Sequence, residues 1–79
     1  MQNNISKYQF NNTNEELKKK ILFVYGNQVE RWAENDHYIA IFELNNYYVE
    51  VRILKYRVVS IKALITTQDW EPFLNQIEI

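Results

Sequence analysis

The alternating pattern of residues 38–54 constrains the fold more than any other feature of the chain. Two runs of mostly β-branched and aromatic residues, 38–44 and 47–54, are separated only by Asn45 and Asn46. Asparagine tolerates a positive φ, so this pair can form a two-residue hairpin turn. The pattern therefore predicts two antiparallel strands joined by a tight turn.

This turn fixes a register that gives the sheet an apolar face and a mixed face. A slip of one residue would exchange the two faces, so the turn and the pattern support the same pairing. The apolar face carries the pairs Leu44/Tyr47, Phe42/Val49, Ala40/Val51 and Tyr38/Ile53. The mixed face carries the pairs Glu43/Tyr48, Ile41/Glu50 and Ile39/Arg52.

A third strand is predicted over residues 58–66. A two-residue loop before it would place Ser60 and Lys62 on the apolar face. A three-residue loop at 55–57 keeps that face apolar and sets Lys62 opposite Glu50, an attractive cross-strand pair. We therefore expect the three-residue loop, with the pairs Ile53/Val59, Val51/Ile61 and Val49/Ala63.

Residues 28–34 are compatible with two structures. Val29, Trp32 and Ala33 fit helical spacing, and the same segment is equally suited to an edge strand. A short strand is favoured because strands follow. The meander is accordingly predicted to have three or four strands.

A helix is predicted over residues 14–25. Thr13 and Glu16 have the spacing of a capping box, and Gly26 stands where helices often end. Leu17, Ile21, Val24 and Tyr25 form the main apolar stripe of this helix, and Leu22 and Phe23 fall outside it. The alternative, a buried strand over residues 21–25, is not excluded by periodicity.

A second helix is predicted over residues 68–78. Its apolar residues follow the spacing of a helix that packs on a core. Proline is tolerated only in the first turn, so Pro72 favours Asp69 over Thr67 as the capping residue. The apolar stripe consists of Trp70, Phe73, Leu74 and Ile77.

The chain is long enough for one domain only, because it has 79 residues. We expect a polar N-terminal arm over residues 1–12, with Ile5, Tyr8 and Phe10 as its apolar residues. Residues 13–79 are expected to form a two-layer α+β domain. Its order is an N-terminal helix, an antiparallel meander and a C-terminal helix.

The composition argues against catalysis, cofactors and metals. There is no cysteine and only one histidine, and a single glycine cannot build a glycine-rich phosphate loop. The acidic residues lack the spacing of a calcium loop. His37 lies beside Asp36 and is interpreted as a solvated turn residue rather than a general base.

Charge and hydropathy also limit the partners and the location. A net charge of −1 provides no general attraction to nucleic acid or anionic membranes. The longest stretch without a charge, residues 21–29, is far shorter than the roughly 20 residues of a membrane span. With a polar N-terminus, the expectation is a cytoplasmic protein, and the abundance of Asn, Ile and Lys hints at a bacterial source.

The mixed face suggests the first functional hypothesis, a non-catalytic module that self-associates or binds a protein partner. Its apolar rim around paired charges is larger than a small monomer usually exposes. If a helix covers this face, the residues are ordinary core; if it stays open, a second copy or another protein binds there. The expected partner-binding residues are Ile39, Ile41, Tyr48, Arg52 and Leu64.

The alternative hypothesis is a nucleic-acid-binding accessory protein. The basic and aromatic loop at 55–57 can stack on bases and contact phosphates. Glu43 and Glu50 on the mixed face would repel a phosphate backbone, so this hypothesis is the less favoured. Its residues are Arg52, Lys55, Tyr56 and Arg57, with Lys62 as a further candidate.

Overall fold

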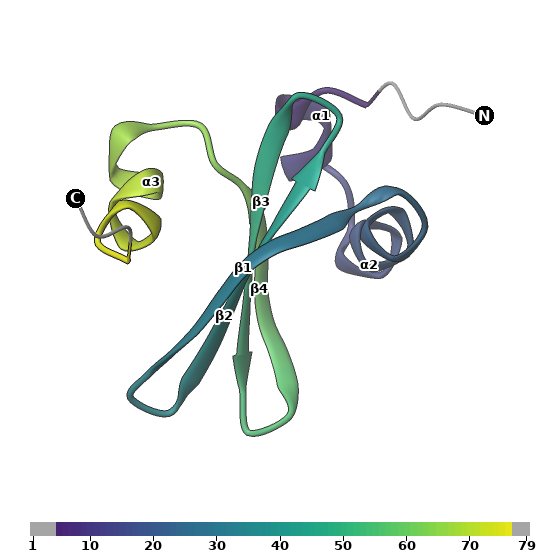
Figure 1. Ribbon diagram of the computed structural model, residues 1–79. Coiled ribbons are helices and arrows are strands. Elements are labelled where there is room, and N and C mark those ends of the chain that lie inside the picture. The colour runs from purple at the N-terminus through teal and green to yellow at the C-terminus, as the bar shows by residue number, and fades with distance from the viewer. Residues whose placement is uncertain (1–4, 77–79) are drawn as a thin grey trace.

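The computed structural model describes residues 5–76, which form three helices and one four-stranded sheet (Figure 1). The sheet is an antiparallel meander with the strand order β1-β2-β3-β4. The elements are α1 (Lys7–Asn11), α2 (Glu15–Tyr25), β1 (Asn27–Glu34), β2 (His37–Leu44), β3 (Tyr47–Leu54), β4 (Arg57–Ala63) and α3 (Thr67–Leu74). This confirms the predicted α+β class and element order, and it resolves residues 28–34 as a strand.

The hairpin of β2 and β3 has the register that its sequence predicts. Leu44 pairs with Tyr47 next to the turn, and the pairing continues without a break to His37 and Leu54. Asn45 has a φ of 56°, which is the left-handed conformation expected of the turn. Local alternation and turn chemistry are therefore enough to determine this part of the sheet.

The loop between β3 and β4 differs from the prediction. It has two residues, Lys55 and Tyr56, so that Ile53 pairs with Val58 instead of Val59. A register shift then leaves Val59 as an extra residue in β4. The bulge restores the predicted pairs Val51/Ile61, Glu50/Lys62 and Val49/Ala63, because one inserted residue compensates for the shorter turn.

The helices lie on both faces of the sheet, which gives three layers instead of the predicted two. Figure 1 shows the sheet edge-on, with α3 on one side and α1 and α2 on the other. Phe10 of α1 and Leu22 of α2 pack against the apolar face. Trp70 and Phe73 of α3 pack against the mixed face.

α1 lies in the segment that the sequence analysis assigned to a polar arm. Ser6 and Gln9 form a capping box at its start. Phe10 is fully buried, and its ring lies edge-on to Tyr47 with centroids 6.4 Å apart. Phe10 thus anchors this segment in the core, and Ile5 just before the helix packs against the same core.

The start of α2 is capped by Asn14, not by the predicted Thr13. The Asn14 carbonyl oxygen Oδ1 accepts a hydrogen bond from the Leu17 N–H at 2.9 Å. The Thr13 hydroxyl instead donates to a carbonyl of α1 at 2.8 Å. Both residue types are common caps, and the end of α1 decides which of them is used.

Gly26 ends α2 for a reason other than a left-handed backbone. Its φ is −78°, which any residue adopts. A Cβ atom there would lie 2.7 Å from the Leu22 carbonyl oxygen. The glycine is therefore required by the close approach of its own helix backbone.

α3 begins earlier than predicted, and Thr66 is its cap rather than Asp69 or Thr67. The Thr66 hydroxyl accepts from the Asp69 N–H at 3.2 Å. The Asp69 carboxylate accepts from the backbone N–H groups of Thr66 and Ile65 at 3.1 and 3.0 Å. These two bonds, together with the nearby Lys62, lower the pKa of Asp69 from 3.8 to about 2.

With this start, Pro72 lies inside α3 instead of in its first turn. Proline has no N–H to donate to the preceding turn, so the helix tolerates one missing backbone bond there. Of the predicted apolar stripe, Trp70 and Phe73 pack on the sheet and Leu74 is exposed. Ile77 lies outside the described residues.

Candidate interaction surface

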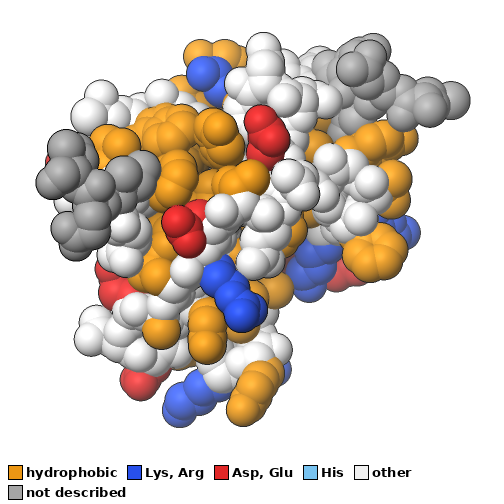
Figure 2. Space-filling view, in the orientation of Figure 1, with side chains coloured by type: hydrophobic (Ala, Val, Ile, Leu, Met, Phe, Trp, Pro, Cys, Tyr) orange, Lys and Arg blue, Asp and Glu red, His pale blue; other side chains and the backbone are white. Residues whose placement is uncertain are grey.

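The mixed face is covered, so the predicted partner-binding surface is mostly core. Ile39, Ile41 and Leu64 are buried under α3 and are not available to a partner. In Figure 2, hydrophobic side chains gather between α3 and the sheet. The sequence pattern identified an apolar patch correctly, but this chain covers the patch with its own C-terminal helix.

Aromatic contacts hold α3 on that face. Trp32 of β1 stacks on Phe73 with an interplanar angle of 7° and centroids 6.3 Å apart. Tyr48 meets Trp70 edge-on at 5.4 Å. Tyr48, the fourth predicted contact residue, is therefore part of the packing between α3 and the sheet.

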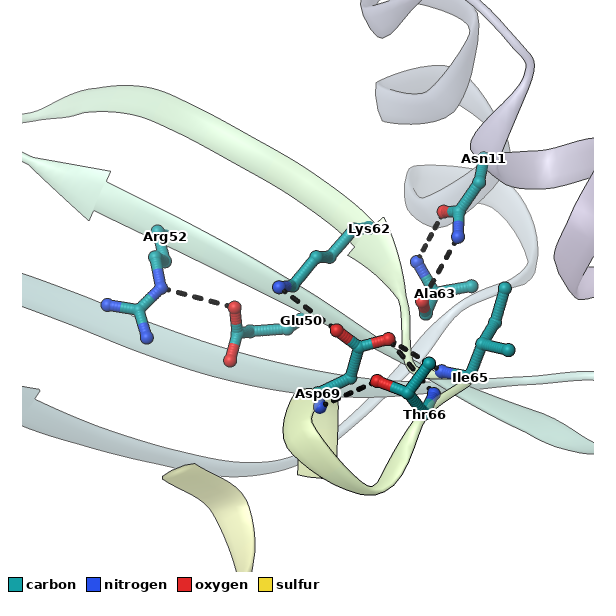
Figure 3. A network of polar contacts seen from close by, with 8 residues as sticks. All are labelled: Asn11, Glu50, Arg52, Lys62, Ala63, Ile65, Thr66 and Asp69. Atoms are coloured by element: carbon teal, nitrogen blue, oxygen red, sulfur yellow. Dashed lines mark hydrogen bonds and ion pairs between the residues drawn. The ribbon is translucent and has the colours of Figure 1, made fainter. Parts of the chain in front are cut away.

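Arg52, the fifth predicted contact residue, pairs with acids of the sheet. Its Nε lies 3.1 Å from Oε1 of Glu50, and its Nη1 lies 3.6 Å from Oε1 of Glu34. Figure 3 shows the first of these pairs beside the contact of Lys62 with Asp69. Because Glu50 is only 1% exposed, Arg52 neutralises a buried carboxylate and is not free to bind a phosphate.

The edge of β4 is blocked by side chains from the helices. Asn11 accepts from the Ala63 N–H at 2.7 Å and donates to the Ala63 carbonyl at 3.2 Å (Figure 3). Lys18 donates to the Ile61 carbonyl at 2.8 Å. These contacts occupy backbone groups that would otherwise pair with an added strand.

The edge of β1 is also protected. A register shift between Gln28 and Glu30 makes Val29 a bulge. The Arg31 N–H donates to the carboxylate of Glu30 at 3.1 Å. A bulge and charged side chains are common devices against edge-to-edge pairing, so neither edge invites a further strand.

The apolar face remains partly open, because α1 and α2 cover only part of it. Next to α2 lies a groove of about 270 Å³, lined mainly by hydrocarbon. Residues from all four strands form the floor of the groove, and residues of α2 form one wall. The lining apolar residues are Leu22, Phe23, Ala40, Phe42, Val51, Ile53, Val58 and Ile61.

The groove continues toward the turns at the far end of the sheet. A second hollow shares Ala40 and Ile53 with the first and extends to Tyr38 and Tyr56. A third hollow shares Tyr38, Tyr56 and Ile53 and is bordered by Asp36 and Lys55. We call this continuous apolar channel, from Phe23 to Tyr56, the trough.

Three aromatic side chains dominate the exposed surface of the trough. Phe23 is 90% exposed, Tyr38 is 55% exposed and Tyr56 is fully exposed. Each of them offers aromatic surface to a partner, Phe23 from α2 and Tyr38 and Tyr56 toward the turns. Exposed apolar side chains that gather along one hollow often mark an interaction site.

Charged groups at the rim of the trough are mostly basic. Lys19, Arg31 and Lys55 contribute to its lining, and Asp36 is the acid among the lining residues. Lys19 has a weak contact of 3.6 Å with Glu16. Within residues 5–76, Arg31 and Lys55 form no ion pair.

The residues of the nucleic-acid hypothesis do not all come together. Lys55, Tyr56 and Arg57 are exposed at the tip of the β3–β4 hairpin. Arg52 is paired with Glu50, and Lys62 contacts Asp69 at 3.3 Å. The tip alone therefore remains as a basic and aromatic element.

The described part of the chain brings together no group of metal-binding side chains. No three His, Asp or Glu side chains among residues 5–76 gather as ion ligands would. His37 begins β2 next to the Asn35-Asp36 turn. None of the helices described is long and apolar enough to cross a bilayer.

The sequence places Phe23 outside the predicted apolar stripe of α2, and the structure exposes it. The predicted stripe is nevertheless not the packed surface of the helix, because Leu22, also outside it, is the buried residue of α2, whereas Leu17 and Val24 of the stripe are 46% and 65% exposed. The open part of the apolar face carries no comparable signal, because its residues read as ordinary core. Comparisons of the chain with protein-family models, with curated proteins and with solved structures found no match.

Proposed function

We propose that this protein is a non-catalytic interaction module that binds a protein partner through the trough. The observation that carries the proposal is Phe23, which is 90% exposed beside an apolar groove of about 270 Å³. Exposing a phenylalanine beside open sheet core is unfavourable unless something covers both. The binding surface lies on the opposite side of the sheet from the one expected from sequence.

The blocked edges support recognition through the face of the sheet. Asn11 and Lys18 occupy the backbone of β4, and the bulge at Val29 distorts β1. A partner that added a strand would have to displace these features. A partner that fills the trough displaces only water from apolar side chains.

The proposal is tested with Phe23→Asp and its neighbour Val24→Asp. Both residues are exposed on α2, but Val24 does not contribute to the trough. Tagged wild-type and variant proteins are expressed in the source cell, and co-purified proteins are quantified by mass spectrometry. We expect a partner whose recovery falls at least about tenfold with Phe23→Asp and is retained with Val24→Asp.

Circular dichroism of both variants provides the control. Because both side chains are exposed, both variants should keep the wild-type spectrum and melting temperature within a few degrees. Equal recovery of every partner with the two variants would contradict the proposal. So would recovery that depends on Val24 and not on Phe23.

Nucleic acid is the second candidate ligand, and one observation favours it. Tyr56 is fully exposed between Lys55 and Arg57 at a hairpin tip. Such a tip can stack on an unpaired base while the cations contact phosphates. Binding to labelled single strands in low salt should then fall with Tyr56→Ala and with rising salt. Absence of binding at micromolar protein in low salt would end this hypothesis.

A further inference from the structure

We infer that the partner segment in the trough is an amphipathic helix whose apolar residues are flanked by Asp and Glu. The inference rests on the proposed function, because it concerns the same surface. Three observations carry it: the shape of the open part of the apolar face, the charges at its rim, and the like charge that the trough of a second copy would present.

The shape of the open region suits a helix that lies beside α2. The strands of eight residues are about 27 Å long, whereas a helix with its side chains is about 10–12 Å wide. In Figure 1 α2 is seen nearly end-on while the strands run across the view, so α2 crosses the sheet. The trough occupies the remaining length of the strands toward the Asn35 and Tyr56 turns.

A helix in that position would cover the part of the apolar face that α1 and α2 leave open. The apolar face of a sheet is normally buried against another element of structure. Phe23 would then lie between two helices, and Tyr38 and Tyr56 would lie along the far side of the added helix. Each would lose exposed apolar surface, which is the expected source of affinity.

The charges at the rim select an acidic segment. Lys19, Arg31 and Lys55 outnumber Asp36, so the lining carries a net charge of about +2 while the whole chain carries −1. The Arg31 guanidinium and the Lys55 ammonium group form no ion pair within the described residues. A segment with Asp or Glu beside its apolar stripe would pair with these cations, and complementary charge of this kind sets specificity.

The same charges argue against a second copy in the trough. Two troughs placed face to face would bring like charges together around both apolar surfaces, which disfavours the complex. The Asn11 contact on β4 and the bulge in β1 also oppose a joining of the two sheets edge to edge. We therefore do not expect two copies to join trough to trough.

The test uses a phage-displayed library of random 16-residue peptides, selected on the full-length protein. We expect enriched peptides with large apolar residues at helical spacing and a net negative charge. Binding of the synthesised peptides, measured by fluorescence anisotropy, should fall at least about tenfold with Arg31→Glu combined with Lys55→Glu. Lys20→Glu, an exposed lysine of α2 outside the trough, should change affinity less than about threefold.

The outcomes separate this inference from the proposed function. Peptides that depend on Phe23 but carry no negative charge would overturn the inference and leave the proposed function intact. Peptides whose binding is unchanged by Phe23→Asp would overturn both. A dimer in light scattering that Phe23→Asp dissociates would overturn the inference by placing a second copy in the trough.

Discussion

Lys55 and Tyr56 hold backbone conformations that glycine or asparagine adopts more easily. Their φ values are 51° and 66°, both in the left-handed region. The two other tight turns place asparagine in this conformation, at Asn35 and Asn45. Strain of this kind is often kept at functional sites, and both residues border the trough.

Replacing the residues of this turn should raise the stability of the fold and weaken binding in the trough. We expect Lys55→Asn combined with Tyr56→Gly to raise the free energy of unfolding by about 1 kcal/mol, because both residues suit the turn. The same change removes an aromatic wall of the trough and should weaken peptide binding. Urea unfolding measures the first effect, and a lower stability would show that the turn is not strained.

Asp69 should make stability depend on acid pH. Its pKa is about 2 in the fold and 3.8 without the cap, so the charged carboxylate stabilises the folded state. That contribution is complete above pH 4 and is lost as the pH falls toward 2. Asp69→Asn should cost about 1 kcal/mol at pH 7 and almost nothing near pH 2, measured by urea unfolding. An equal deficit at both pH values would contradict this explanation.

Arg52 should matter for stability far more than an ordinary surface cation. Its removal leaves the carboxylate of Glu50 buried without its cation, so Arg52→Ala should cost about 2–3 kcal/mol. The partly exposed pair of Lys62 and Asp69 provides the comparison, and Lys62→Ala should cost less than about 1 kcal/mol. Chemical denaturation of the two variants checks the order, and equal losses would contradict it.

At the scale of elements, the sequence predicts what is local. The register of β2 and β3 follows from Asn45-Asn46 and the alternation around it. Three pairs between β3 and β4 were predicted correctly, but the length of the loop before β4 was not. The alternating pattern does not indicate the bulge at Val59, which compensates for the shorter loop. The predicted capping residues of α2 and α3 were wrong by one and three positions. At α2, Thr13 and Asn14 are both good caps, and the end of the neighbouring helix α1 determines which of them is used.

The sequence does not reveal which face each helix covers. Both faces carry apolar residues, and the connections after Gly26 and Ala63 permit either side. The expected interaction residues Ile39, Ile41 and Leu64 became core for this reason, whereas part of the predicted core became the trough. Where α3 packs on the sheet, Trp70 contacts Tyr48 and Phe73 contacts Trp32. The spacing of these residues in the sequence does not predict these contacts.

The attachment of α3 is tested with two residues of that helix. Trp70→Ala should lower the free energy of unfolding by about 2–3 kcal/mol, because it uncovers part of the buried mixed face. Leu74→Ala, at an exposed position of the same helix, should cost less than about 1 kcal/mol. Similar losses for both would mean that the aromatic contacts do not hold α3 in place.

At the scale of the whole molecule, the two faces of the sheet differ in how far the helices cover them. α3 and its aromatic contacts seal the mixed face, while α1 and α2 leave the trough open on the apolar face (Figure 1). Both edges are blocked against further strands. The trough is therefore the part of the sheet's apolar face that α1 and α2 leave uncovered, and the proposed function follows from that asymmetry.

The most direct test of this account replaces single residues with the photo-crosslinking amino acid p-benzoylphenylalanine in the source cell. Position 23 lies at the trough, position 24 is its exposed neighbour on α2, and position 74 is exposed on α3. We expect a covalent adduct with another protein from position 23, and much less from positions 24 and 74. Adducts of equal yield from all three positions, or an adduct from position 74 alone, would contradict it.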